Sequence, residues 1–237
     1  MSKRVVTAAL CAVLVSCAVN AQKKGAGKLF PQFWGGETSL AIESSCITAE
    51  GDCNGDGIKD LAVIATPKDP AGLRTRDDGY VYNFNKPVLA LFLGQKNGRL
   101  KLFKEYKDTI PGDDEENDDC FHETELKING DGDICIAVSE FYSAGSSDAP
   151  ATEYVFRWQK NDFFLIGKNT GSFSRYTGEA MDVSENYLTH KRRTVTYNMF
   201  DEDVPEEETW TELFDAPLRT LGSDMLTVSE PEIEPVG

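Results

Sequence analysis

Hydrophobic and polar residues form short alternating runs along most of the chain, separated by clusters rich in glycine, asparagine and aspartate. Apolar runs with such turn residues between them are typical of antiparallel hairpins. The clearest predicted hairpins join 88–93 to 100–103, 126–128 to 134–138, and 154–158 to 163–166, with weaker strands expected at 179–183 and 193–197. Beyond the N-terminal region no stretch sustains a helical period. The pattern therefore predicts an all-β fold, an antiparallel hairpin meander arranged as propeller-like blades or as a sandwich.

The two ends of the chain differ in composition from this middle region. The predicted organisation is a signal peptide at 1–21, a linker at 22–35, a single all-β domain at 36–216, and a C-terminal segment with an acidic tail at 217–237. Polar stretches at 66–79, 111–119 and 201–208 are expected to be exposed loops.

The N-terminus has the pattern of an export signal. Lys3 and Arg4 precede a largely apolar stretch, 5–19, which is shorter than the roughly 20 residues of a membrane-spanning helix. Cleavage after Ala21 would release a soluble periplasmic or secreted protein. The run Leu14-Val15-Ser16-Cys17 also matches a bacterial lipobox, in which Cys17 would carry the lipid that anchors the protein to the envelope. Both forms of processing remain open.

Charge excludes two classes of partner. The chain carries 24 Lys and Arg against 40 Asp and Glu, a formal net charge of −16. Nucleic acids and anionic membrane surfaces both need positive charge on the protein, so neither is an expected partner. The hydrophobic content of 40% is enough for a packed core and argues against a disordered acidic protein.

Four of the 6 cysteines lie outside the signal: Cys46, Cys53, Cys120 and Cys135. An even number in an exported protein allows disulfides, with three connectivities. The local pairs are favoured, Cys46 with Cys53 and Cys120 with Cys135. No Cys-x-x-Cys occurs, so zinc binding and redox chemistry are not expected.

One acidic loop stands out from the other polar segments. In the loop 52–60, oxygen-bearing side chains occupy positions 1, 3, 5 and 9, and Gly57 occupies position 6. Calcium takes 6–8 oxygen ligands, and a glycine lets the chain coil tightly around one ion. The expected calcium ligands are the side chains of Asp52, Asn54, Asp56 and Asp60 and the carbonyl of Ile58.

Two other structures share features of this loop, the EF-hand and the metal-free acidic turn. An EF-hand needs a bidentate Glu at position 12, where this chain has Val63, and an apolar strand rather than a helix follows the loop. A metal-free acidic turn is the remaining alternative.

A second acidic turn, 129–133, has Lys127 and Cys135 where the outer carboxylates would be, so a plain hairpin turn is favoured there over a weak cation site.

The acidic loop also carries a resemblance to a known family. The segment Gly51-Asp52-Cys53-Asn54-Gly55-Asp56-Gly57-Ile58-Lys59-Asp60-Leu61 resembles the calcium loop of FG-GAP and VCBS-type repeats, found in integrin α-chain propellers and exported bacterial proteins. The segment 154–167 is similar to a strand–turn–strand unit of uncharacterised exported proteins that carry one such loop. The resemblance implies calcium binding and a β-propeller-like unit. Integrin-like members bind ligands through tandem blades, whereas this chain has one well-formed loop.

No catalytic residues are predicted. The chain lacks a Gly-x-Ser-x-Gly, a phosphate loop and a His-Glu-x-x-His, and His122 and His190 are interpreted as surface residues. Core packing is favoured over a sugar or peptide groove for the aromatic residues Trp34, Trp158, Trp210, Phe163 and Phe164. The leading hypothesis is a non-catalytic, calcium-stabilised β module that binds a protein or glycan at the cell envelope. The alternatives are an acidic inhibitor of a cationic protein and a carboxylate-based exported hydrolase.

Overall fold

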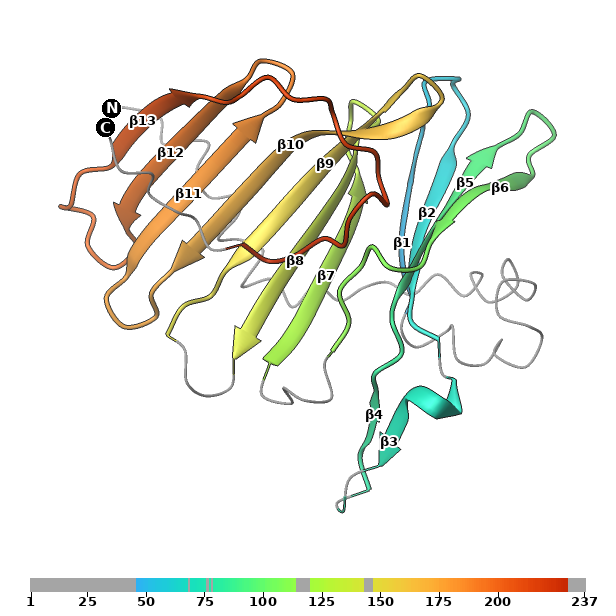
Figure 1. The fold of residues 1–237 in the computed structure, drawn as a ribbon, viewed down its shortest axis with the longest axis horizontal. Helices are drawn as coiled ribbons and strands as arrows, with labels where there is room; N and C mark the ends of the chain where they lie inside the picture. The colour runs from blue at the N-terminus through green and yellow to red at the C-terminus, as the bar shows by residue number, and fades with distance from the viewer. Residues whose placement is uncertain are drawn as a thin grey trace.

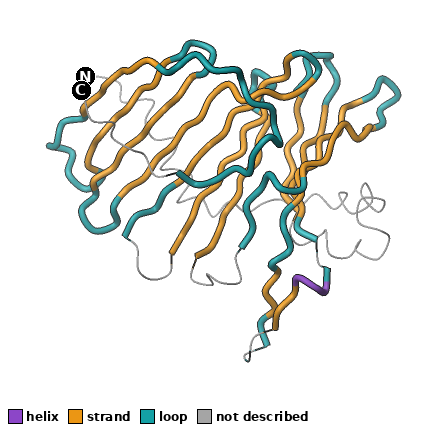
Figure 2. Tube along the Cα trace, viewed as in Figure 1, coloured by secondary structure: helices purple, strands orange, loops and turns teal. Residues whose placement is uncertain are grey.

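The computed structural model describes residues 46–229, except 68, 76, 78, 114–119 and 143–146. The predicted signal peptide with its lipobox, the predicted linker and the end of the acidic tail lie outside the described residues. Within the described part of the chain, no helix is long and apolar enough to cross a membrane. Strands dominate this part, and its one short helical turn precedes β3 (Figure 2).

The strands form three antiparallel sheets, so the all-β prediction is confirmed. A four-stranded sheet has the order β1-β2-β5-β6, a seven-stranded sheet the order β13-β12-β11-β10-β9-β8-β7, and β3 pairs with β4 (Figure 1). The elements are β1 (Cys46–Gly51), β2 (Asp60–Ala65), η2 (Pro70–Gly72), β3 (Leu73–Thr75), β4 (Val81–Asn83), β5 (Val88–Gly94), β6 (Leu100–Tyr106), β7 (Cys120–Ile128), β8 (Ile134–Tyr142), β9 (Ala151–Gln159), β10 (Asp162–Phe173), β11 (Glu179–Asn186), β12 (Lys191–Asn198) and β13 (Glu207–Glu212).

The seven-stranded sheet is a meander in which each strand pairs with the next along the chain. All three predicted hairpins are present. The tight turn within each hairpin has a backbone conformation that its residues tolerate. Gly98 and Gly132 have positive φ in the first two turns, and Lys160 and Asn161 have positive φ in the third. The segment 66–79, expected to be a loop, instead contains η2 and β3, which together with β4 form a small projecting hairpin (Figure 1).

The two larger sheets pack against one another around a shared core. An aromatic cluster joins them: Phe103 of β6 makes edge contacts with Trp158 of β9 and Phe163 of β10. At the edge, β1 lies against β7, since a Cβ added to Gly51 would lie 2.6 Å from Ile128 Cγ2. The aromatic prediction is therefore confirmed for Phe163, which is buried in the core, and for Trp158, which is partly buried and packs against it.

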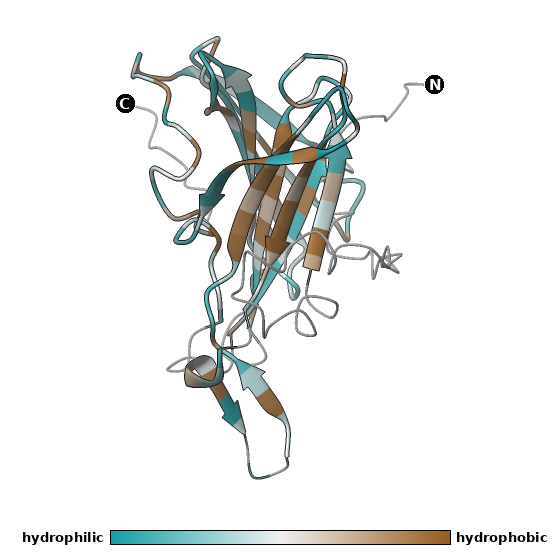
Figure 3. Ribbon diagram, turned by 90° about the vertical axis from the view of Figure 1, so that its right-hand side faces the viewer, coloured by the Kyte–Doolittle hydropathy of each residue, from teal (hydrophilic) through white to brown (hydrophobic). Residues whose placement is uncertain are grey.

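In the four-stranded sheet, called the small sheet below, the central strands β2 and β5 are apolar on both faces. Its outer face carries a second cluster of buried residues, Leu61, Val63, Ala65, Ala90 and Phe92. Figure 3 looks onto this sheet and shows its central strands coloured as hydrophobic along most of their length. Burial on both faces explains why β2 and β5 appear in the sequence as continuous apolar runs rather than as alternating ones.

The chain after β13, residues 213–229, crosses the inner face of the large sheet and is called the C-terminal strap (Figure 1). Its backbone is attached at several points, among them Leu165 N to Arg219 O at 2.8 Å and Leu221 N to Phe163 O at 2.8 Å. Leu221 and Leu226 are buried in the main core. The strap thus closes one side of the core, although its sequence has no strand-like alternation.

Candidate functional site

The acidic loop between β1 and β2 is organised around the carboxylate of Asp52. Asp52 Oδ1 accepts hydrogen bonds from the backbone N–H groups of Gly55 at 2.8 Å and Asp56 at 3.1 Å. Asp52 Oδ2 accepts one from Gly57 N at 2.7 Å. Positive φ at Gly55 and Gly57 lets the chain curl around this side chain. The loop is therefore coiled tightly, as the sequence predicts.

Asn54 and Asp56 continue the same network on the exposed side of the loop. Asn54 Oδ1 accepts from Asp56 N at 3.0 Å, and Asp56 Oδ1 accepts from Ile58 N at 2.8 Å. Asn54 Nδ2 donates to Asp56 Oδ2 at 3.3 Å. The structure thus brings together the predicted residues at positions 1, 3 and 5.

Asp60, at position 9, has a different environment from the other three. Its side chain is only 1% exposed and lies between the loop and the neighbouring strand. Oδ1 accepts from Gly94 N of β5 at 2.8 Å, and Oδ2 accepts from both the N–H and the thiol of Cys53, at 2.8 and 3.0 Å. Burial, together with this bond to Asp60, raises the pKa of the Cys53 thiol. Asp60 therefore fastens the loop to the sheet.

The donor set of the loop is suited to a hard cation. Its side-chain ligands would be carboxylate and amide oxygens. Asp52 Oδ2, both oxygens of Asp56 and Asp60 Oδ1 each accept a single hydrogen bond, which leaves a lone pair at each for a cation. Among the described residues, no three His, Cys, Asp or Glu side chains already form a cluster that could hold a metal. Calcium would also bind amide and backbone oxygens, and a cluster defined by His, Cys, Asp and Glu side chains leaves these out.

The second acidic turn connects β7 to β8 as a hairpin. Asn129 Oδ1 accepts from the backbone N–H groups of Asp131 and Asp133, both at 2.9 Å. The buried carboxylate of Asp133 pairs with Arg157 of β9 through two bonds of 2.7 Å each, Nε to Oδ1 and an NH2 group to Oδ2. Arg157 thereby neutralises the only buried carboxylate of this turn, and the predicted hairpin is confirmed.

His122, on the edge strand β7, lies between the carboxylates of Asp113 and Glu140. His122 Nε2 is 3.3 Å from Glu140 Oε1, and His122 Nδ1 is 3.7 Å from Asp113 Oδ1. Asp113 foremost, with Glu140, raises the pKa of His122. The side chain of His122 is 16% exposed, so its interpretation as a surface residue is wrong.

The predicted disulfides are also wrong. Cys46, Cys53, Cys120 and Cys135 are all free thiols. Cys46 pairs with Ala65 at one end of β1, and Cys53 follows the other end. Cys120 and Cys135 are seven strand positions apart in the register of β7 and β8, about 24 Å at 3.4 Å per residue. A disulfide needs Cα atoms within about 7 Å, so strand pairing separates the cysteines that are close in sequence.

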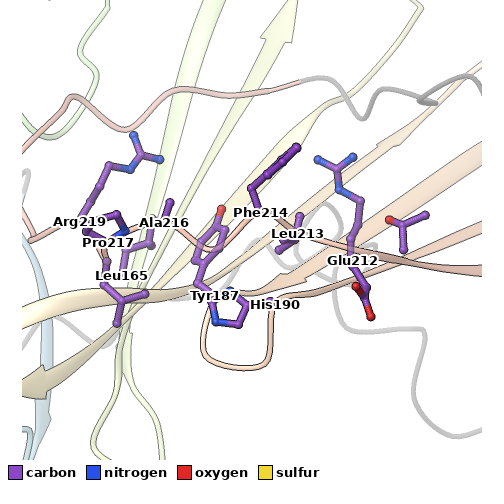
Figure 4. Close-up of a pocket in the computed structure, with 12 residues that line it drawn as sticks. Leu165, Tyr187, His190, Glu212, Leu213, Phe214, Ala216, Pro217 and Arg219 are labelled. Atoms are coloured by element: carbon purple, nitrogen blue, oxygen red, sulfur yellow. The ribbon is translucent and has the colours of Figure 1, made fainter.

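A hollow of about 370 Å³ lies beneath the C-terminal strap (Figure 4). Leu165 and Tyr187 of the sheet side line it, together with His190, Phe214 and Arg219. The strap is attached to the sheet on both sides of the hollow. On one side Leu213 N donates to His190 O at 2.8 Å, and on the other Leu165 N donates to Arg219 O. The cations of the hollow have acidic partners: Arg192 contacts Glu185, and Arg219 contacts Asp224.

A wider hollow of about 530 Å³ lies on the opposite, outer face of the large sheet. It runs over β9 to β13 and is bordered by Trp210, whose side chain is 59% exposed. The prediction that Trp210 packs in the core is therefore wrong. Sequence reasoning missed this surface because its residues come from five strands, whose alignment depends on the register.

Comparison of the chain with protein-family models, with curated proteins and with solved structures found no match.

Proposed function

We propose that the chain is an exported, non-catalytic, calcium-stabilised β module that binds a protein or glycan at the cell envelope. The supporting observation is the hydrogen-bond network of the acidic loop, which joins Asp52, Asn54 and Asp56, residues with the oxygen side chains that calcium takes as ligands. Bound calcium would supply a fixed double positive charge that offsets the repulsion between the loop carboxylates. The residues that would hold it are Asp52, Asn54, Asp56, Asp60 and the carbonyl of Ile58.

The position of the loop favours a stabilising role for the metal. Asp60 bonds to Gly94 of the small sheet, and Asp52 lies against Gly132 of the large sheet. An ion bound between these contacts would stabilise both sheets together, because a metal that binds only the folded chain adds its binding energy to folding. A β framework fixed in this way suits a binding protein, whose surface must keep its shape.

The acidic alternative also has support. The stretch 201–208 and the edge strand β13 are exposed throughout, and they contain Glu206, Glu207, Glu208 and Glu212. An exposed acidic edge could attract a cationic protein. Binding of that kind would weaken steeply as salt increases.

Calorimetric titration with calcium tests the proposal. The mature chain, stripped of metal with EDTA and dialysed, is titrated beside Asp56→Ala and the matched control Asp131→Ala, which removes an exposed aspartate from the second acidic turn. Saturable binding in the parent and the control, lost in Asp56→Ala, is the expected result. Absence of binding in the parent would contradict the proposal.

A further inference from the structure

The outer face of the large sheet carries one continuous row of polar residues. Antiparallel pairing places directly opposed residues on the same face of a sheet. The register aligns one residue from each of five neighbouring strands in this way: Glu153, Asn169, Ser184, Arg193 and Trp210. Adjacent strands are about 4.8 Å apart, so the row presents a polar group or a ring at each such interval across the sheet.

Hydrogen bonds hold the first half of the row in fixed orientations. Lys127 Nζ contacts Glu153 Oε1 at 2.6 Å, and Asn169 Nδ2 donates to Glu153 Oε2 at 2.9 Å. The Ser184 hydroxyl donates to Asn169 Oδ1. Each polar side chain is thereby oriented before any ligand arrives, which lowers the entropy cost of binding.

The second half of the row is fixed by one glutamate. Glu208 of β13 accepts from Arg193 at 2.8 Å through one oxygen and from Trp210 Nε1 at 2.6 Å through the other. The indole N–H is therefore engaged while more than half of the side chain remains exposed. A fixed, exposed aromatic ring is a stacking platform for a flat apolar surface.

The hollow beside this row exists because small residues form its floor and leave space there. Gly167 lies beneath it and Ser184 beside it, with Val155 and Ile166 adding apolar surface. Most of the charges around it are paired within the protein, Arg193 with Glu208 and Glu185 with Arg192, and the one further charged residue of the lining, Lys191, is exposed to solvent. A ligand that complements this surface is uncharged, carries many hydroxyl groups, and has an apolar face for the ring of Trp210.

We infer that the row and the hollow beside it form a groove that binds a neutral oligosaccharide. Trp210 stacks on one sugar ring, and Asn169, Ser184 and Arg193 bond to hydroxyl groups of the oligosaccharide. Sugar hydroxyls both donate and accept, and the row offers both kinds of partner. The length of the row across β9–β13 fits several linked sugars rather than one. This inference rests on the proposed binding function and narrows its ligand to a glycan.

The test measures binding of cellohexaose, N-acetylchitohexaose and α-mannohexaose to the parent chain by calorimetry, with a decalysine peptide as a fourth probe. Binding of one of these glycans is expected. Trp210→Ala should weaken it about tenfold or more, as expected for an anchoring aromatic, Trp210→Phe less, and Asn169→Ala about threefold, as for one lost hydrogen bond. Phe214→Ala, which removes an exposed ring of the strap on the other face of the sheet, is the matched control and should leave glycan binding unchanged.

Two outcomes would overturn the inference: no binding of any of the three glycans, or glycan binding that Trp210→Ala leaves intact. Binding of decalysine without any glycan is a case of the first outcome and would favour the acidic alternative. Calcium titration of the same variants separates the two proposals. A chain that binds calcium but no glycan retains the calcium-stabilised module, and one that binds glycan without calcium retains only the groove.

Discussion

Gly132, in the turn between β7 and β8, lies directly against the backbone of Asp52, in the loop between β1 and β2. A Cβ added to Gly132 would lie 2.5 Å from the Asp52 carbonyl oxygen. The turn belongs to the large sheet and the loop to the small one, so the two acidic segments form a contact between the sheets. Asp52 in turn orients the N–H groups of its own loop. A change at Gly132 should therefore affect the proposed calcium loop.

Gly132→Ala should be strongly destabilising. Gly132 has φ +81, a conformation that costs a residue with a Cβ about 1–2 kcal/mol, and the added methyl group would clash with backbone that cannot move freely. The expected loss in the free energy of unfolding is about 2–4 kcal/mol, measured by urea denaturation. Gly130→Ala is the control, because a Cβ there meets nothing within 4 Å. Equal effects of the two substitutions would show that the contact with Asp52 is unimportant.

Asp60→Ala tests the role of the buried carboxylate as a fastening point. Removing it leaves two backbone N–H groups, of Cys53 and Gly94, without their acceptor, and the expected loss of stability is about 3 kcal/mol. Asp60→Asn keeps one acceptor oxygen and should lose less. Urea denaturation in EDTA separates this structural role from calcium binding. A loss below about 1 kcal/mol for Asp60→Ala would contradict the fastening role.

Stability should depend on pH through His122. Because its pKa is raised in the folded chain, protonated His122 contributes stability that is fully present below the unfolded pKa of about 6.5 and is lost as pH rises through the higher folded value. The difference in Tm between the parent and His122→Gln should therefore be largest near pH 6 and shrink towards pH 8–9. Melting curves across that range check it. A difference that grows with pH would contradict the assignment.

His190→Gln provides the control for this profile. His190 is 3.8 Å from Asp215, whose side chain is 93% exposed, so solvent screens that pair. We expect the Tm of this variant to follow the parent across the same pH range. A profile for His190→Gln matching that of His122→Gln would show that the pH dependence does not arise at β7.

The hairpins could be predicted because their signals are local. The polar turn residues 159–162 lie between two apolar runs, and both features are visible within a dozen residues of sequence; the structure then places Lys160 and Asn161 at positive φ in that turn. The coiling of the loop 52–60 is predictable for the same reason, since spacing and Gly57 set its shape. The family resemblance and the calcium ion stay predictions.

Features that depend on strand register could not be predicted. The row from Glu153 to Trp210 exists only because five strands align, and a shift of one residue would place those side chains on the other face. The cysteines are free thiols for the same reason, because the strand register holds them apart. The C-terminal strap was missed because Leu221 and Leu226 are isolated apolar residues in a polar segment, held by tertiary contacts rather than by a repeating pattern.

Thermal unfolding of residues 22–237 in EDTA and in millimolar calcium, beside Asp56→Ala and Asp131→Ala, tests whether calcium stabilises the fold through the acidic loop. Calcium at about 100 times its Kd adds about 2.7 kcal/mol, or roughly 5–11 °C for a chain of this size. We expect that shift in the parent and in Asp131→Ala and its loss in Asp56→Ala. A parent that melts at the same temperature in both buffers, or an equal shift in Asp56→Ala, would contradict it.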